Sequence, residues 1–122
     1  MAIDRTQVPA PVAPREAIQV DELGGEVIVQ GLLLSQRLQM AAARQRLSVP
    51  RAGETEEEAR ERAAGDVICE TLARCVLASD GEPLWSAAQW QVFGSTHVSA
   101  ALGLFNAAQR LNGFDSGAAR GN

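Results

Sequence analysis

Residues 83–109 read PLWSAAQWQVFGSTHVSAALGLFNAAQ and contain no Asp, Glu, Lys or Arg. Within this charge-free segment, Ser86 and Gln89 have the spacing of a capping box, in which the serine side chain accepts an otherwise unpaired helical N–H. Trp85 and Trp90 flank this pair at the positions of a hydrophobic staple, which fixes the angle at which a chain enters a helix. The segment therefore predicts a short helix that begins after this serine.

This short helix is expected to end near Gly94, and a longer helix is predicted from about His97 to Leu111. Gly113 fits the left-handed residue that follows many helix ends. On the longer helix, only Ser99, Gly103, Asn106 and Arg110 mark a polar side. One apolar stripe is formed by Val98, Ala101, Leu102, Phe105 and Ala108, and it is widened by Leu104 and Leu111 beside it. So wide an apolar stripe suits a helix that touches two neighbours, or one neighbour and a partner.

Toward the N-terminus, a capping box formed by Thr55 and Glu58 begins another predicted helix, which runs to about Ala78. Its inward residues are expected to be Val67, Ile68, Leu72, Cys75 and Val76. On its solvated face, the spacing of opposite charges predicts the ion pairs Glu56–Arg60 and Glu58–Arg62.

A further amphipathic helix is predicted from Leu34 to about Leu47, where the chain approaches Pro50 and the helix must stop. Residues 48–54 form a loop. Apolar side chains recur at three- and four-residue spacing along this helix. The expected inward face consists of Leu34, Leu38, Ala41 and Ala42.

Two short runs rich in β-branched residues, 17–20 and 26–30, flank the turn sequence Asp21-Glu22-Leu23-Gly24-Gly25. Because paired glycines adopt positive φ at little cost, this pattern predicts a β-hairpin. An isolated hairpin is only marginally stable, so its apolar face must pack on the helices or pair with another sheet edge.

The predicted fold is therefore mainly α, a small bundle of about four helices with an N-terminal β-hairpin. Residues 1–15 hold three of the five prolines and predict a flexible arm. Residues 16–114 form a single predicted domain, in keeping with a chain of 122 residues. Residues 115–122 are expected to be a disordered tail.

The composition bounds the class of protein. Fifteen acidic residues against 11 arginines give a net charge of −4, without the basic excess expected of a nucleic-acid-binding domain. No apolar stretch approaches a membrane span or a signal peptide. The spacing of Cys69 and Cys75 fits neither a metal site nor a disulfide, so two buried thiols of an intracellular protein are expected.

No catalytic, cofactor-binding or metal-binding constellation is found in the sequence. His97 is the single histidine and is expected to be a capping or solvated residue. Gly24 and Gly25 are not a phosphate loop, since no lysine follows and the chain enters a strand. The sequence therefore predicts a protein that is not an enzyme.

The charge-free segment is the best candidate for a surface that binds a partner. Of the 26 charged residues, 23 precede residue 83, so the two halves of the chain differ sharply in polarity. Apolar anchors at helical spacing are typical of helix-in-groove recognition. The predicted partner-binding residues are Trp85, Trp90, Phe93, Leu102, Leu104, Phe105 and Leu111.

Three segments resemble a known family, the tail assembly chaperones of phages with long, non-contractile tails. Residues 19–32 (QVDELGGEVIVQGL) are similar to its opening V-x-x-E-x-G-G-x-V-x-V-R-x-L pattern, residues 75–86 (CVLASDGEPLWS) to a later D-G-x-P turn, and residues 101–114 (ALGLFNAAQRLNGF) to its C-terminal L-F-x-x-a-x-r-L-x-G-F pattern. Gln30 departs from the pattern, which has a basic residue there, and the loop at 48–54 also looks variable.

The resemblance implies a small helical protein that binds the tape measure protein in the host cell cytoplasm while subunits of the major tail tube protein are recruited. It also implies that the chain is absent from the mature virion. Self-association is a further possibility, because many weak copies bind a long rod by avidity.

Two other functions stay open at the level of the sequence. The chain could be a minor tail protein that is retained in the virion. A less favoured alternative is a DNA-binding regulator with a helix-turn-helix at about residues 87–94 and 97–111, whose second helix would offer only Arg110 among charged residues.

Overall fold

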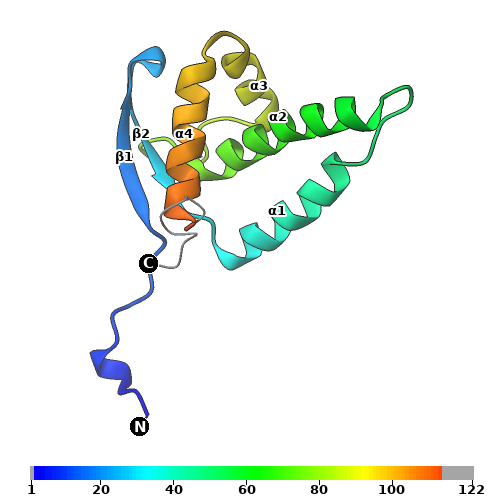
Figure 1. Ribbon diagram of the computed structural model, residues 1–122. Helices are drawn as coiled ribbons and strands as arrows, with labels where there is room; N and C mark the ends of the chain where they lie inside the picture. Colours follow the sequence, from blue (N-terminus) through cyan, green and yellow to red (C-terminus); the bar gives the residue numbers. More distant parts are fainter. Residues whose placement is uncertain (1, 114–122) are drawn as a thin grey trace.

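A three-stranded antiparallel sheet and four helices make up the chain in the computed structural model, which describes residues 2–113 (Figure 1). This architecture confirms the predicted helical bundle with an N-terminal hairpin. The main elements are β1 (Arg15–Val20), β2 (Gly25–Gln30), α1 (Leu34–Leu47), α2 (Glu56–Cys75), β3 (Val76–Leu77), α3 (Ala87–Thr96) and α4 (Val98–Leu111).

The hairpin forms as predicted, with Ile18 opposite Val27 across β1 and β2. A short 3-10 helix, Asp21–Leu23, makes the connection, and Gly24 closes it at a φ of +79°. Such a positive φ carries no steric cost for glycine. The side chain of Gln30 accepts a hydrogen bond from the Arg15 guanidinium, so an amide interacts with an arginine at this position.

The third strand is absent from the sequence prediction, which extended the second helix to about Ala78. In the structure α2 ends at Cys75, and Val76 pairs with Val29 of β2. The carbonyl of Val76 also accepts the N–H of Leu84 at 3.0 Å. Pairing on both sides satisfies the backbone of this two-residue strand better than another helical turn would, because the strand lies in the buried core.

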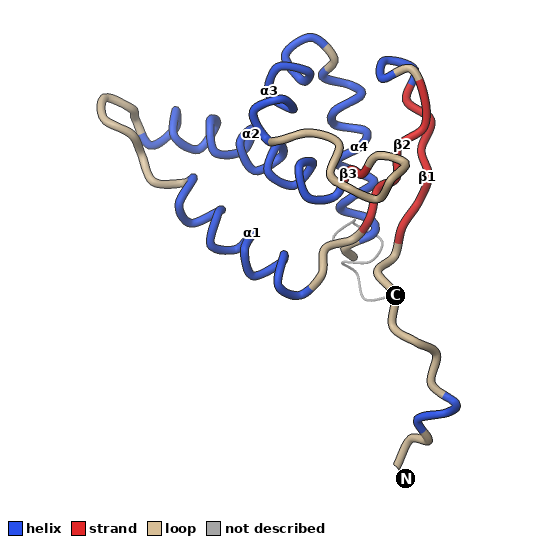
Figure 2. Tube along the Cα trace, turned by 180° about the vertical axis from the view of Figure 1, so that it is seen from behind, coloured by secondary structure: helices blue, strands red, loops and turns tan. Residues whose placement is uncertain are grey.

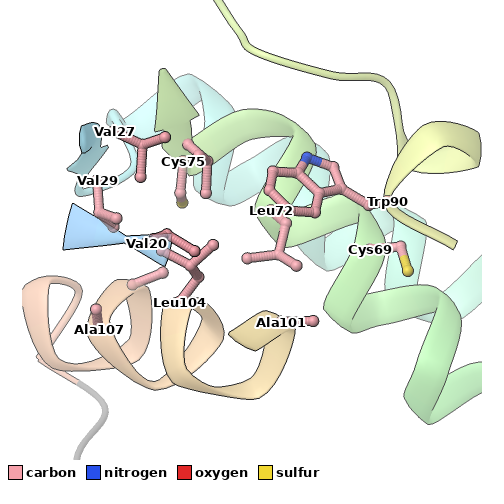
Figure 3. Packing of buried hydrophobic residues seen from close by; sticks show 12 residues of the cluster. Val20, Val27, Val29, Cys69, Leu72, Cys75, Trp90, Ala101, Leu104 and Ala107 are labelled. Atoms are coloured by element: carbon pink, nitrogen blue, oxygen red, sulfur yellow. The ribbon is translucent and has the colours of Figure 1, made fainter. Parts of the chain in front are cut away.

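The core lies between the sheet, the second half of α2, α3 and α4 (Figure 3). Cys69 and Cys75 are both buried and unpaired, as predicted. The buried core cluster consists of Val20, Val27, Val29, Cys69, Leu72, Cys75, Val76, Trp90, Ala101, Leu104, Ala107 and Ala108.

Helix α1 lies outside this core and packs on the first half of α2, which extends away from the sheet (Figure 1). Its predicted inward face is wrong, because all four of the predicted residues are exposed, with Leu34 at 74% and Leu38 at 65%. Met40 and Ala43 are buried instead. A polar contact with the end of α4 fixes this orientation of α1, because Arg37 donates a hydrogen bond to the carbonyl of Asn112 at 2.9 Å.

A polar clamp fixes the loop between α1 and α2. The Arg62 guanidinium contacts the carboxylate of Glu54 at 2.8 Å and that of Asp66 at 3.1 Å, and it donates to the carbonyls of Leu47 and Val49. This hydrogen bonding to Arg62 lowers the pKa of Glu54 from 4.5 to about 2.

The two ion pairs predicted on the solvated face of this helix are therefore wrong within residues 2–113. Arg62 pairs with Glu54 and Asp66, while Glu58 accepts the backbone N–H of Thr55 at 2.9 Å. The capping box that begins α2 is confirmed, and its formation occupies the carboxylate that the ion-pair prediction had assigned to Arg62.

Residues 2–14 run away from the body of the domain, as Figures 1 and 2 show. Pro14 marks the end of this arm, and its carbonyl accepts the N–H of Gly31 at 2.7 Å. A Cβ at Gly31 would meet the Pro14 ring at 3.0 Å and the Leu111 carbonyl at 3.2 Å, so the arm, β2 and α4 approach closely here. The predicted disordered tail at 115–122 lies outside the described residues.

Candidate functional site

Three aromatic rings join α3 to the turn that precedes it. Ser86 accepts the backbone N–H of Gln89 at 3.3 Å, and the side chain of Gln89 returns a bond to the N–H of Ser86, so the predicted capping box is present. The ring centroids of Trp85 and Trp90 lie 4.8 Å apart in an edge-on arrangement, and Phe93 contacts both. The predicted staple therefore fixes the entry angle of α3.

The structure divides the seven predicted partner-binding residues into two groups. Trp90 is fully buried and Leu104 is 2% exposed, so both side chains belong to the core and offer a partner little accessible surface. Both face inward because α3 and α4 pack on α2, which turns their central apolar side chains toward Leu72 (Figure 3). The indole N–H of Trp90 makes no hydrogen bond within residues 2–113.

The other five predicted residues are accessible to differing degrees. Leu102 is exposed at 41%, whereas the remaining four are partly buried against the core. These four are Trp85, Phe93, Phe105 and Leu111. Leu111 lies at the far end of α4, next to Gly31, and is separate from the others.

An apolar groove runs between α2 and α4 and joins two neighbouring hollows of about 270 and 510 Å³, which share Ile68 as a lining residue. Along α4 its lining residues recur at helical spacing, so they follow one side of the helix. The α4 residues that line it are Val98, Ala101, Leu102, Phe105 and Gln109. We call this depression the α2–α4 groove.

Helix α2 supplies a wall of the groove that the sequence reasoning missed. Ala64 and Gly65 are exposed in the middle of α2, on the same face as Ile68 one turn later. Because their side chains are small, the two helices leave a hollow between them. The run Ala63-Ala64-Gly65 is the one sequence signal that could have indicated it.

The two ends of the α2–α4 groove differ in charge. The hollow near α3 is lined by uncharged residues alone, including Trp90, Gln91 and Leu102. The hollow near α1 is lined by the two arginines Arg44 and Arg60 beside its apolar floor. The groove therefore passes from a neutral end to a cationic end.

Cys69 lines the neutral hollow and is 8% exposed. Burial raises the pKa of its thiol, and the neighbouring carboxylate of Asp66 raises it further. A thiol with a raised pKa is a weak nucleophile near neutral pH. This cysteine is thus an apolar wall residue of the groove.

Two other surfaces display apolar side chains. A hollow of about 430 Å³ on the outer side of α3 is lined by Trp85, Val92, Phe93 and His97, among others. His97 is exposed, which agrees with the predicted alternative of a solvated residue. The centroid of its ring lies 4.8 Å from that of Phe93. The second surface is the outer face of α1 around Leu34 and Leu38, which are both exposed.

Within residues 2–113, no group of three or more His, Cys, Asp or Glu side chains is arranged to hold a metal ion. No helix of this part of the chain is long and apolar enough to cross a membrane.

Comparisons of the chain with protein-family models, with curated proteins and with solved structures found no match.

Proposed function

We propose that this chain is a phage tail assembly chaperone that holds an apolar helical segment of the tape measure protein in the α2–α4 groove. The observation that carries the proposal is the row of accessible apolar residues along α4, Val98, Leu102 and Phe105, above a floor of small residues. Helix-in-groove recognition uses apolar anchors at this spacing. The resemblance of residues 19–32, 75–86 and 101–114 to the tail chaperone family supplies the identity of the client.

The shape of the groove suits a transient client better than a permanent one. Only two large apolar residues on the groove side of α4 are exposed, Val98 at 57% and Leu102 at 41%, so a helix docked there buries a modest apolar area. Modest apolar area gives weak binding at each site, and many copies along one rod add affinity by avidity. Release of the copies as tail tube subunits arrive then requires little energy per copy.

The alternative of a DNA-binding helix-turn-helix receives less support from the described residues. The guanidinium of Arg110 on α4 forms an ion pair with Glu16 of β1. The opposite side of α4 carries Leu104 and Ala108, which are buried. A recognition helix must instead project polar side chains into the major groove.

The test is coexpression of the full chain with the tape measure protein from the same genome. The variant combines Val98→Glu and Leu102→Glu, which places two carboxylates in the groove at exposed positions. The matched control combines Leu34→Glu and Leu38→Glu, which makes the same chemical change on the outer face of α1. Circular dichroism verifies that both variants keep the helical content of the parent.

We expect the parent chain and the α1 control to keep the tape measure protein soluble, and the groove variant to leave most of it in the pellet. A groove variant that solubilises the client as well as the parent does would contradict the proposal. If the tape measure protein becomes insoluble only with the α1 control, the client binds the outer face of α1 instead.

The proposed place of the protein in assembly has its own test. Mass spectrometry of purified virions is expected to find the tape measure and tail tube proteins but not this chain. Detection of the chain at a fixed ratio to the tube protein would favour a minor tail protein that stays in the particle.

A further inference from the structure

The cationic end of the α2–α4 groove contains two guanidinium groups that have no partner among residues 2–113. Arg44 of α1 and Arg60 of α2 are exposed and line the same hollow of about 510 Å³, together with Ser48 and Gln109. Neither guanidinium makes a hydrogen bond or ion pair within residues 2–113. Glu56 lines the adjoining hollow with Arg60, one helical turn away, yet the two form no ion pair.

Most other arginines of the folded domain are engaged. Arg62 and Arg74 form ion pairs with neighbouring carboxylates, Arg110 pairs with Glu16 across the domain, and Arg15 donates to a side-chain amide. The chain as a whole carries an excess of acidic residues. Among residues 15–113, the arginines whose guanidinium groups make no hydrogen bond or ion pair with another described residue are Arg44, Arg46 and Arg60, and two of these three line the cationic hollow.

We propose that the α2–α4 groove selects an acidic amphipathic helix, with apolar anchors over Ile68 and Leu102 and carboxylates against Arg44 and Arg60. The inference rests on the proposed function for the identity of the client and adds the chemistry of the segment that is bound. The neutral hollow gives affinity by apolar burial. The two arginines give register and selectivity, because guanidinium groups match carboxylates in geometry as well as charge.

A nucleic acid phosphate is the other anion that arginines bind, and the lining of the groove disfavours it. Sequence-tolerant binding of single strands uses several aromatic platforms along a cationic groove. The cationic hollow contains one aromatic ring, Phe105, and its remaining floor is aliphatic: Ala63, Ala64, Val67 and Ile68. A floor of this kind fits the apolar side of a helix.

The experiment selects peptides on the immobilised full chain from a displayed library of helix-forming peptides, each about 16 residues and hence about 24 Å long. The same selection is repeated on the double variant Arg44→Ala/Arg60→Ala. The matched control is Arg46→Ala, which removes an exposed arginine of α1 that does not line the groove. A further selection on Leu102→Glu tests whether the enriched peptides use the neutral hollow.

On the parent chain and on the Arg46→Ala control, we expect enrichment of peptides that combine an apolar stripe with Asp or Glu near one end. On the double variant, the apolar stripe is expected to persist and the acidic preference to disappear. The affinity of an enriched acidic peptide for the double variant should fall by about three- to ten-fold, the size expected of two exposed ion pairs.

Each other result has a distinct meaning. Enrichment of an apolar stripe without acidic residues, or an acidic preference that survives the double variant, overturns the inference and leaves the proposed function intact. If no peptide depends on Leu102, the groove is not a helix-binding site, and the proposed function fails with it. Binding of a short duplex DNA that is lost in the double variant would replace the acidic helix with a nucleic acid.

Discussion

Two regions of this molecule are held together by different forces. The sheet, the second half of α2, α3 and α4 share one apolar core, which encloses Trp90 and Leu104. The hairpin of α1 and the first half of α2 extends away from that core. Small apolar contacts at Met40 and Ala59 hold it together, along with the hydrogen bonds of Arg62.

The charge-free segment, residues 83–109, contributes both to the core and to the groove. One side of α4 builds the core, while the neighbouring side borders the α2–α4 groove. The charged hairpin contributes Arg44 and Arg60 to the far end of the same groove. The groove therefore joins a neutral end built on the core to a cationic end whose position depends on polar contacts.

The largest effect is expected from the core of the neutral region. Replacing Leu104 with Ala should reduce the free energy of unfolding by about 3 kcal/mol, because a buried leucine leaves both lost burial and a cavity. The matched control Leu102→Ala, at an exposed position two residues away, should cost about 0.5 kcal/mol or less. Urea denaturation followed by tryptophan fluorescence measures both values. Equal costs for the two variants would contradict the assignment of core and groove sides on α4.

The junction between the two regions is expected to show the next largest effect. Asn112 is 5% exposed, and its side-chain oxygen accepts the N–H of Leu32 at 2.7 Å. Replacing it with Ala leaves that N–H unpaired and should reduce the free energy of unfolding by about 1–3 kcal/mol. Thermal unfolding measures the loss. A variant as stable as the parent would show that Leu32 finds another acceptor.

A smaller and local loss of stability is expected when the Arg62 clamp on the loop between α1 and α2 is removed. Replacing Arg62 with Ala removes the donor to Leu47 and Val49 and the partner of Glu54. Hydrogen exchange should then become faster in residues 44–62, while the amides of α4 keep the protection of the parent. Arg60→Ala is the control, since its guanidinium holds no loop. Uniform acceleration across both regions would contradict the view that they are stabilised separately.

Lowering the pH of the unsubstituted protein should loosen the hairpin of α1 and α2 before it affects the core. The pKa of Glu54 is lowered to about 2 in the folded chain from 4.5, so its contribution to stability is present above pH 4.5 and is lost as the pH falls toward about 2. Over this interval a fluorophore attached to α1 should report loosening before the fluorescence of Trp85 and Trp90 changes. Coincident changes in the two signals would show a single cooperative unit.

Local signals in the sequence predicted much of the fold. The capping boxes at Thr55 and Ser86 placed the starts of α2 and α3, because each depends on residues only three positions apart. The β-hairpin of β1 and β2 was likewise predicted from its paired glycines, Gly24 and Gly25. These features require no knowledge of distant contacts.

The errors arose where distant contacts decide the outcome. The face of α1 that is buried depends on Arg37 and Arg62, which bind backbone carbonyls far along the chain. The strand after Cys75 exists because β2 lies beside it. The groove was half predicted, since Leu102 and Phe105 lie in the charge-free segment but Ile68 and the two arginines come from other helices.

The proposed function places the client in the α2–α4 groove and not on the outer face of α1, where Leu34 and Leu38 are exposed. Hydroxyl-radical footprinting of the chain, alone and in complex with the tape measure protein, compares the two surfaces in one experiment. We predict slower oxidation of Leu102 and Phe105 in the complex and unchanged oxidation of Leu34 and Leu38. Protection confined to Leu34 and Leu38 would contradict the claim.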